Sequence, residues 1–169
     1  DAPPLALAVG DGNHSLATAK AVFLERTKDM TPEQRLSDPS RFALCEVVNL
    51  HDRTLQFEPI HRVLFGVDKQ KLLNRLHSVH SVADGEAPGA QSFTLVDAEG
   101  ERTLSILDPR HNLTVGTLQL FLDEYLKENE GEIDYIHGDG TVRALAGKGA
   151  LGFLLPAMRK QQLFPTVIQ

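Results

Sequence analysis

The sequence predicts an α+β fold, a mixed sheet with flanking helices, in a single domain that spans all 169 residues. Two observations predict this class. Short apolar runs that are typical of strands are interspersed with segments whose apolar residues recur at helical spacing. The two kinds of element follow one another without a strict strand–helix alternation, which favours a mixed sheet over a doubly wound parallel sheet.

Composition places the chain among folded, soluble domains. Hydrophobic residues make up 41% and charged residues 24% of the sequence, values that exclude a disordered chain. The charge balance of 17 basic and 23 acidic residues gives −6. A net negative charge weighs against nucleic-acid binding by this segment, because that affinity comes largely from Lys and Arg neutralising phosphates.

The cellular setting predicted by the sequence is the cytoplasm. The only cysteine, Cys45, has no partner for an internal disulfide, and its apolar neighbours predict a buried strand residue. We find no signal peptide, and the apolar runs are too short to span a membrane. Since the chain starts at Asp1 and enters a predicted strand almost at once, we expect a fragment of a longer protein that lacks N- and C-terminal parts.

The N-terminal third is predicted to contain a strand, a Gly-Asp-Gly loop and a helix in succession. Residues 5–9 form an apolar run between Pro4 and Gly10, which suits a buried strand. Residues 15–28 are rich in Ala and have helical spacing. Thr31 followed by Pro32 predicts the start of a short helix. Residues 41–50 and 54–57 are predicted to be two strands joined by a turn.

The remaining elements follow from apolar spacing and turn residues. Asp68 is a predicted N-cap for a helix that ends near His77. Two runs flanking Asp97-Ala98-Glu99-Gly100 predict a β-hairpin. An amphipathic helix, a strand, a short helix and a final strand are then expected over residues 117–128, 133–136, 141–146 and 150–155.

The loop from Gly10 to Ser15 is the most specific chemical feature of the sequence. Between a strand and a helix, such a loop presents backbone N–H groups at the positive end of the helix dipole, which suits an anion. Gly10 and Gly12 permit close approach of the backbone, and Asn13 and Ser15 add side-chain hydrogen bonds. We therefore predict these four residues as phosphate-binding.

Two further residues of the loop are candidates for catalysis. His14 can donate to a phosphate oxygen or shuttle a proton. Asp11 repels phosphate, so a role as metal ligand or as base for a substrate hydroxyl fits it better. The structural alternative, a tight turn in which Asp11 or Asn13 caps the helix, stays open.

A second candidate lies at Glu58-Pro59-Ile60-His61-Arg62. Arg62 can clamp a carboxylate or phosphate with two hydrogen bonds, and His61 can act as acid or base. In a strand these neighbours point to opposite faces, so only one of them enters a given cleft. On the residues alone, we favour the alternative of a rim arginine and a structural histidine.

The loop His137-Gly138-Asp139-Gly140-Thr141 echoes the first one. We interpret it as a helix start capped by Asp139 or Thr141. His77 and His80 could lie on one helical face, but no carboxylate partner stands at metal-site spacing, so we predict no zinc site and no metal-binding cluster.

Three features together resemble an uncharacterised bacterial and archaeal family, domain of unknown function 1015. They are Asp11-Gly12-Asn13-His14-Ser15, the Pro59-Ile60-His61-Arg62 element and the stretch from Tyr135 to Pro156. Family members carry Asp-Gly-His-His-Arg-like and Pro-Thr-His-Arg elements. The first loop is also similar to that of the ParB and sulfiredoxin superfamily, which includes free-serine kinases.

The resemblance implies a nucleotide- or phosphate-binding protein. Gly12, Asn13, His14 and Ser15 would hold phosphate, and Asp11 would lie beside the reacting groups. Asn13 and Ser15 depart from the His and Arg of the kinases, so a phosphate clamp is lost, and Arg62 would supply the missing charge. The acidic catalytic residues of the kinases lie upstream of the loop.

Three functions therefore follow as expectations. The first is an ATP- or ADP-dependent kinase that uses Mg²⁺ and phosphorylates a small hydroxyl metabolite such as serine. The second is a ParB-like, DNA-associated regulator. The third is a non-catalytic interaction module, and the sequence leaves a homodimer open.

Overall fold

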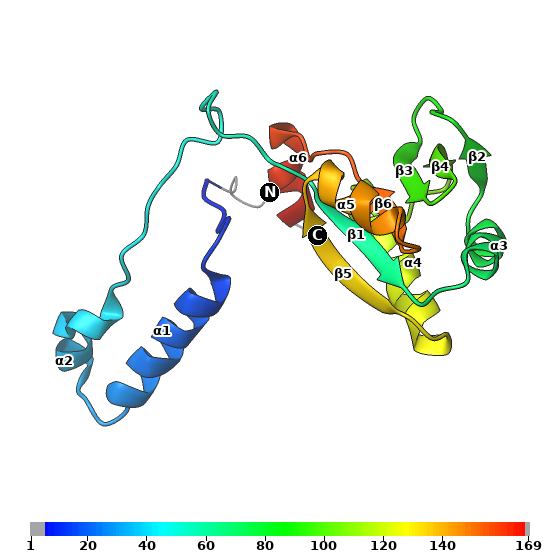
Figure 1. Ribbon diagram of the computed structural model, residues 1–169. Coiled ribbons are helices and arrows are strands. Elements are labelled where there is room, and N and C mark those ends of the chain that lie inside the picture. The colour runs from blue at the N-terminus through cyan, green and yellow to red at the C-terminus, as the bar shows by residue number, and fades with distance from the viewer. Residues whose placement is uncertain (1–5, 168–169) are drawn as a thin grey trace. The chain divides into compact units, whose positions relative to one another are not determined.

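The computed structural model describes residues 6–167. It forms two compact units, residues 1–55 and 56–169, where the sequence predicts one domain. Figure 1 shows the first unit in blue to cyan and the second in green to red.

The first unit is a helical hairpin. It contains α1 (Asn13–Arg26), α2 (Pro32–Ser37) and the 3-10 turn η1 (Pro39–Arg41). The predicted cap of α2 is confirmed, because Thr31 accepts a hydrogen bond from the Gln34 N–H while the Gln34 side chain accepts from the Thr31 N–H. An ion pair of 3.2 Å between Arg26 and Asp38 links α1 to η1.

The strands predicted in this unit are wrong. Residues 6–9 and 42–49 have no regular secondary structure, and Leu5 lies outside the described residues. The described part of the unit contains no strand that could pair with either run, and an unpaired strand leaves its N–H and C=O groups without a ladder. Cys45, predicted to be buried in a strand, is exposed.

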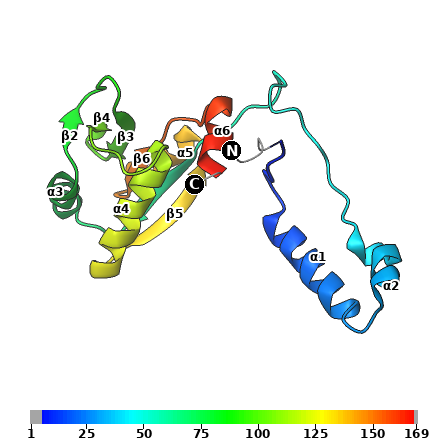
Figure 2. The same ribbon diagram turned by 180° about the vertical axis from the view of Figure 1, so that it is seen from behind.

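The second unit is built on an antiparallel sheet. Its six strands lie in the order β2-β4-β3-β6-β1-β5. Four helices accompany the sheet in the described part of this unit, and they can be followed in Figures 1 and 2. In chain order the elements are β1 (Ile60–Phe65), α3 (Lys69–Val79), β2 (Val82–Asp84), β3 (Gln91–Asp97), β4 (Gly100–Ile106), α4 (Thr114–Glu128), β5 (Glu132–His137), α5 (Asp139–Ala146), β6 (Leu151–Leu154) and α6 (Lys160–Val167).

The α+β class is confirmed, but the sheet is not mixed. Every pairing between described strands is antiparallel. The crossover β5–α5–β6 does return two strands in the same direction, since both are antiparallel to β1. However, β1 lies between them, so the two never pair with each other. The sequence pattern predicts the strand–helix–strand unit, but it does not show that β1 lies between its two strands in the sheet.

Two apolar layers sandwich the sheet. Leu64 of β1 belongs to a core that α3 and α4 complete on one face. Val63 packs with Val142 and Ala146 of α5 on the other. Accordingly, α5 lies in front of the sheet in Figure 1 and α4 in front of it in Figure 2. Successive residues of β1 therefore face different helices, as the period of a strand requires.

The helices and the hairpin predicted in this unit are largely confirmed. Asp68 caps α3 by accepting from the Lys71 N–H at 2.9 Å. Asp97 accepts from the N–H groups of Glu99 and Gly100 in the turn between β3 and β4. None of the helices in the described part of the chain combines the length and apolar character that a membrane span requires.

Candidate functional site

The predicted phosphate loop begins a helix of 14 residues in the first unit. Gly12 precedes α1 with φ of +86°, a conformation that favours glycine. Its N–H donates to Asp11 Oδ1 at 2.7 Å. The first main-chain bond of the helix runs from the Leu16 N–H to the Gly12 carbonyl at 2.9 Å. Gly10, Asp11, Asn13, His14 and Ser15 are all exposed, so the loop brings the predicted residues together at the surface.

The N-terminus of α1 has no side-chain cap and no acidic residue in its first turn. The interpretation of Asp11 or Asn13 as a cap is therefore wrong. By contrast, Thr31 caps α2 and Asp68 caps α3. The N–H groups of Asn13, His14 and Ser15 precede the first intrahelical bond, so they point out of the helix and are open to an acceptor.

His61 and Arg62 share β1 in the second unit but face opposite sides of the sheet. His61 lies on the side of α5, where its ring contacts Asp139. Arg62 lies on the side of α4, where it contacts Gln119. The two predicted residues therefore belong to two separate polar clusters.

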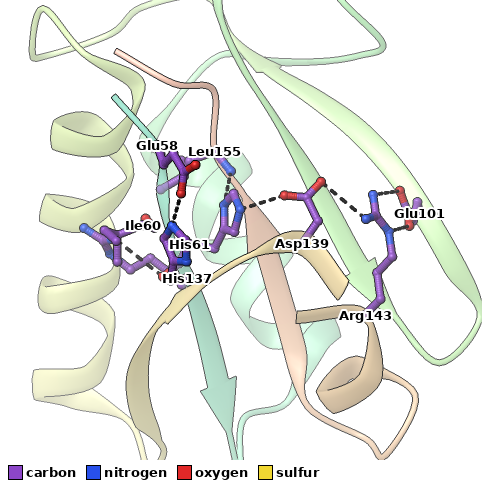
Figure 3. A network of polar contacts seen from close by, with 9 residues as sticks. Glu58, Ile60, His61, Glu101, His137, Asp139, Arg143 and Leu155 are labelled. Atoms are coloured by element: carbon purple, nitrogen blue, oxygen red, sulfur yellow. Dashed lines mark hydrogen bonds and ion pairs between the residues drawn. The ribbon is translucent and has the colours of Figure 1, made fainter. Parts of the chain in front are cut away.

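The His61 ring is fully engaged on the α5 side (Figure 3). Only 1% of His61 is exposed. Its Nδ1 accepts a hydrogen bond from the Leu155 N–H at 3.0 Å, and its Nε2 lies 2.9 Å from Asp139 Oδ1. A backbone N–H can only donate, so Nδ1 carries the lone pair and Nε2 the proton of the neutral ring. His61 thus positions Asp139, with neither nitrogen facing solvent.

Asp139 is the residue that sequence reasoning missed. It is not a cap: Gly138 holds the N-cap position of α5 without a side-chain bond. The Asp139 side chain is 52% exposed and also contacts Arg143 at 3.3 Å. Arg143 in turn binds Glu101, and this hydrogen bond raises the pKa of Arg143. Figure 3 shows the resulting chain from Leu155 to Glu101. The echo of the first loop at Gly138-Asp139-Gly140 was the signal available.

Arg62 is buried among neutral groups on the α4 side. It is 8% exposed. Its Nε donates to Gln119 Oε1 at 2.6 Å, its Nη1 donates to the carbonyls of Ile60 and His61, and its guanidinium lies 4.6 Å from the centre of the Tyr135 ring. Burial lowers the pKa of Arg62, an effect that electrostatic interactions with Tyr135 and Asp123 oppose.

Glu58 pairs with His137 beside this cluster, at the start of β1 and the end of β5 (Figure 3). Both side chains are exposed, at 62% each. Within the described residues, no group of three or more His, Cys, Asp or Glu side chains could hold a metal ion. Together, the second unit carries a positioned carboxylate on one face of its sheet and a buried cation on the other.

The chain belongs to the DUF1015 family of proteins of unknown function, since the family model matches residues 2–125. The match includes the Gly10–Ser15 loop, His61, Arg62 and Gln119, and it ends before Tyr135 and Asp139. No curated protein and no solved structure matches the chain. The likeness of the loop to the ParB superfamily stays a prediction.

Proposed function

We propose that this chain binds the phosphate groups of a nucleotide at the loop from Gly10 to Ser15. We further propose that it serves phosphoryl transfer to a small hydroxyl metabolite such as serine. The observation that carries the proposal is the uncapped N-terminus of α1, which begins in an exposed glycine turn.

The loop offers an anion three kinds of interaction. The N–H groups of Asn13, His14 and Ser15 can donate hydrogen bonds to an anion, whereas at α2 and α3 a capping side chain accepts from the N–H groups of the first turn. The dipole of α1 favours a negative charge by about 0.3–1 kcal/mol at an exposed position. The side chains of Asn13, His14 and Ser15 are exposed and add hydrogen-bonding groups. Gly12 keeps the approach open, because no atom lies within 4 Å of the position of its missing Cβ.

Asp11 fits a Mg²⁺-bound nucleotide. Mg²⁺ in nucleotide sites is held by one or two carboxylates together with phosphate oxygens and waters. Asp11 is exposed, and the Gly12 N–H holds its Oδ1, which leaves Oδ2 to contact the ion. Bound there, Mg²⁺ would neutralise charge on the phosphates. Asp11 would hold the ion or accept the proton of the hydroxyl acceptor.

Calorimetric titration of the protein with ATP, ADP and pyrophosphate in Mg²⁺ tests the proposal. We expect binding that disappears in the Asp11→Ala/His14→Ala variant. The matched control is Asp29→Ala/His51→Ala, which removes an exposed Asp and an exposed His of the same unit outside the loop and should bind as the parent does. Equal binding by both double variants, or no binding by the parent protein, would show that the loop is not a phosphate-binding site.

A second candidate function, a homodimeric interaction module, is favoured by the surface of the first unit. Its described residues bury no hydrophobic side chain. Large apolar residues are exposed on α1 and in the segment after η1, among them Val22, Leu24, Phe42, Leu44 and Val47. Apolar surface of this kind commonly marks a protein–protein contact.

The oligomeric state tests this second candidate. We expect a dimer in sedimentation equilibrium and a shift to monomer for Leu44→Asp/Val47→Asp. A parent protein that sediments as a monomer at every concentration would contradict it.

A further inference from the structure

Arg62 is a buried cation with no carboxylate at ion-pair distance among the described residues. Asp123, which accepts a hydrogen bond from Gln119, acts on it from farther away. The structure pairs it with no carboxylate among residues 6–167, and its contacts are an amide oxygen, two carbonyls and an aromatic ring. Arg143, on the opposite face of the sheet, is half exposed and still pairs with two carboxylates, those of Glu101 and Asp139. A charge taken out of water is costly unless it is paired, so the arrangement at Arg62 is suited to a negative group from outside.

The free end of Arg62 reaches solvent. Nε and Nη1 are engaged, and no described residue accepts a hydrogen bond from Nη2. Among the described residues, the sole buried side-chain polar atom without a partner is Gln91 Oε1. Nη2 is therefore in contact with solvent even though the side chain as a whole is 8% exposed.

Tyr135 provides a second donor in the same cluster of contacts. It lies opposite Arg62 in the register of β5 against β1 and is 52% exposed. Gln119 Nε2 donates to the Tyr135 hydroxyl at 3.1 Å and to Asp123 Oδ1 at 2.7 Å. The Tyr135 oxygen thus accepts from Gln119, which leaves its own O–H to donate outward. Gln119 is oriented from both sides and holds the guanidinium against the ring.

We propose that Arg62 Nη2 and the Tyr135 hydroxyl bind the carboxylate group of a small metabolite. Asp123 makes the site favour a carboxylate over a phosphate. It accepts a hydrogen bond from Gln119 and its negative charge acts on Arg62, so it repels a phosphate dianion more strongly than a carboxylate monoanion. The site lies within the second unit, so it is independent of the nucleotide loop and survives if that proposal fails.

Tyrosine fluorescence measures this binding directly. The chain has two tyrosines and no tryptophan, so a Tyr125→Phe background leaves Tyr135 as the reporter. We expect sodium acetate and sodium glycolate to change its emission with saturation in the millimolar range. Sodium chloride at equal ionic strength should have no saturable effect, and sodium phosphate should bind at least threefold more weakly than acetate.

Three variants in that background separate binding from folding. Arg62→Gln should abolish the saturable response. Gln119→Glu supplies the missing carboxylate beside Arg62 and should weaken acetate binding at least tenfold in a folded protein, as judged by circular dichroism. Arg143→Gln, on the other face of the sheet, should bind as the background does. The proposal is overturned if acetate acts as chloride does, if Gln119→Glu binds normally, or if phosphate binds more tightly than acetate.

Discussion

Replacing His61 by Phe tests whether its ring links three segments of the second unit. His61 accepts from the Leu155 N–H and contacts Asp139, residues that lie 94 and 78 positions away in the chain. Phe is similar in size and fills the space, but it can neither accept nor donate these bonds. The variant therefore loses stability because polar groups are left without hydrogen-bond partners, and not because a cavity forms.

The structure sets the magnitude of this cost. Leu155 is 5% exposed, so its N–H loses its partner with little access to water, at about 1–3 kcal/mol. Asp139 is half exposed and recovers hydrogen bonds from solvent, which adds no more than about 1 kcal/mol. We expect His61→Phe to lower the free energy of unfolding by about 1–4 kcal/mol. The control Asp139→Asn keeps an acceptor for Nε2–H and should cost less than about 1 kcal/mol.

Urea unfolding followed by tyrosine fluorescence is the assay. Both tyrosines, Tyr125 and Tyr135, lie in the second unit, so the signal reports that unit alone. Nitrogen chemical shifts of the ring should also place the proton of neutral His61 on Nε2. An unfolding free energy unchanged in His61→Phe, a similar loss in Asp139→Asn, or a proton on Nδ1 would refute the reasoning.

Two further predictions concern stability. A Cβ on Gly152 would lie 2.4 Å from Val142 Cγ1, so Gly152→Ala should cost about 1–3 kcal/mol; adding Val142→Ala should cost less than the sum of the two single changes in urea unfolding. Hydrogen bonds from the Ser40 hydroxyl and N–H lower the pKa of Asp38 in the first unit. The ionised Asp38 carboxylate therefore stabilises the first unit fully above the pKa that an Asp has in the unfolded chain, about 3.9. This stabilisation is lost as the pH falls through the lower pKa of Asp38 in the folded chain. Circular dichroism should show this acid transition, and Asp38→Asn should lack it.

The sequence predicts the second unit better than the first, for a physical reason. Asp68 and the Asp97–Gly100 turn carry local capping and turn chemistry, and the structure confirms both. The segments at residues 6–9 and 42–49 show only an apolar sequence pattern. A strand also needs a neighbouring strand to pair with, and a short apolar run does not specify one. The sequence predicts no strand at β1, since His61 and Arg62 interrupt its apolar pattern.

The candidate sites divide in the same way. The Gly10–Ser15 loop is contiguous, so its chemistry can be predicted from adjacent residues. The contacts of Arg62 with Gln119, and of His61 with Asp139, join residues 57 and 78 positions apart, and only the folded sheet brings them together. Asp139 could be interpreted as a cap because an Asp at a helix start usually is one; its contact with His61 has no local signature.

Nuclear magnetic resonance of the amide groups tests the central proposal, phosphate binding at α1, most directly. On titration with ATP and Mg²⁺, we expect the largest shifts on the N–H groups of Asn13, His14 and Ser15. We also expect Asn13→Asp, which adds a negative charge at the start of the helix, to keep α1 helical and to weaken nucleotide binding at least tenfold. Unshifted amides at these three residues, or unchanged affinity in Asn13→Asp, would contradict the account.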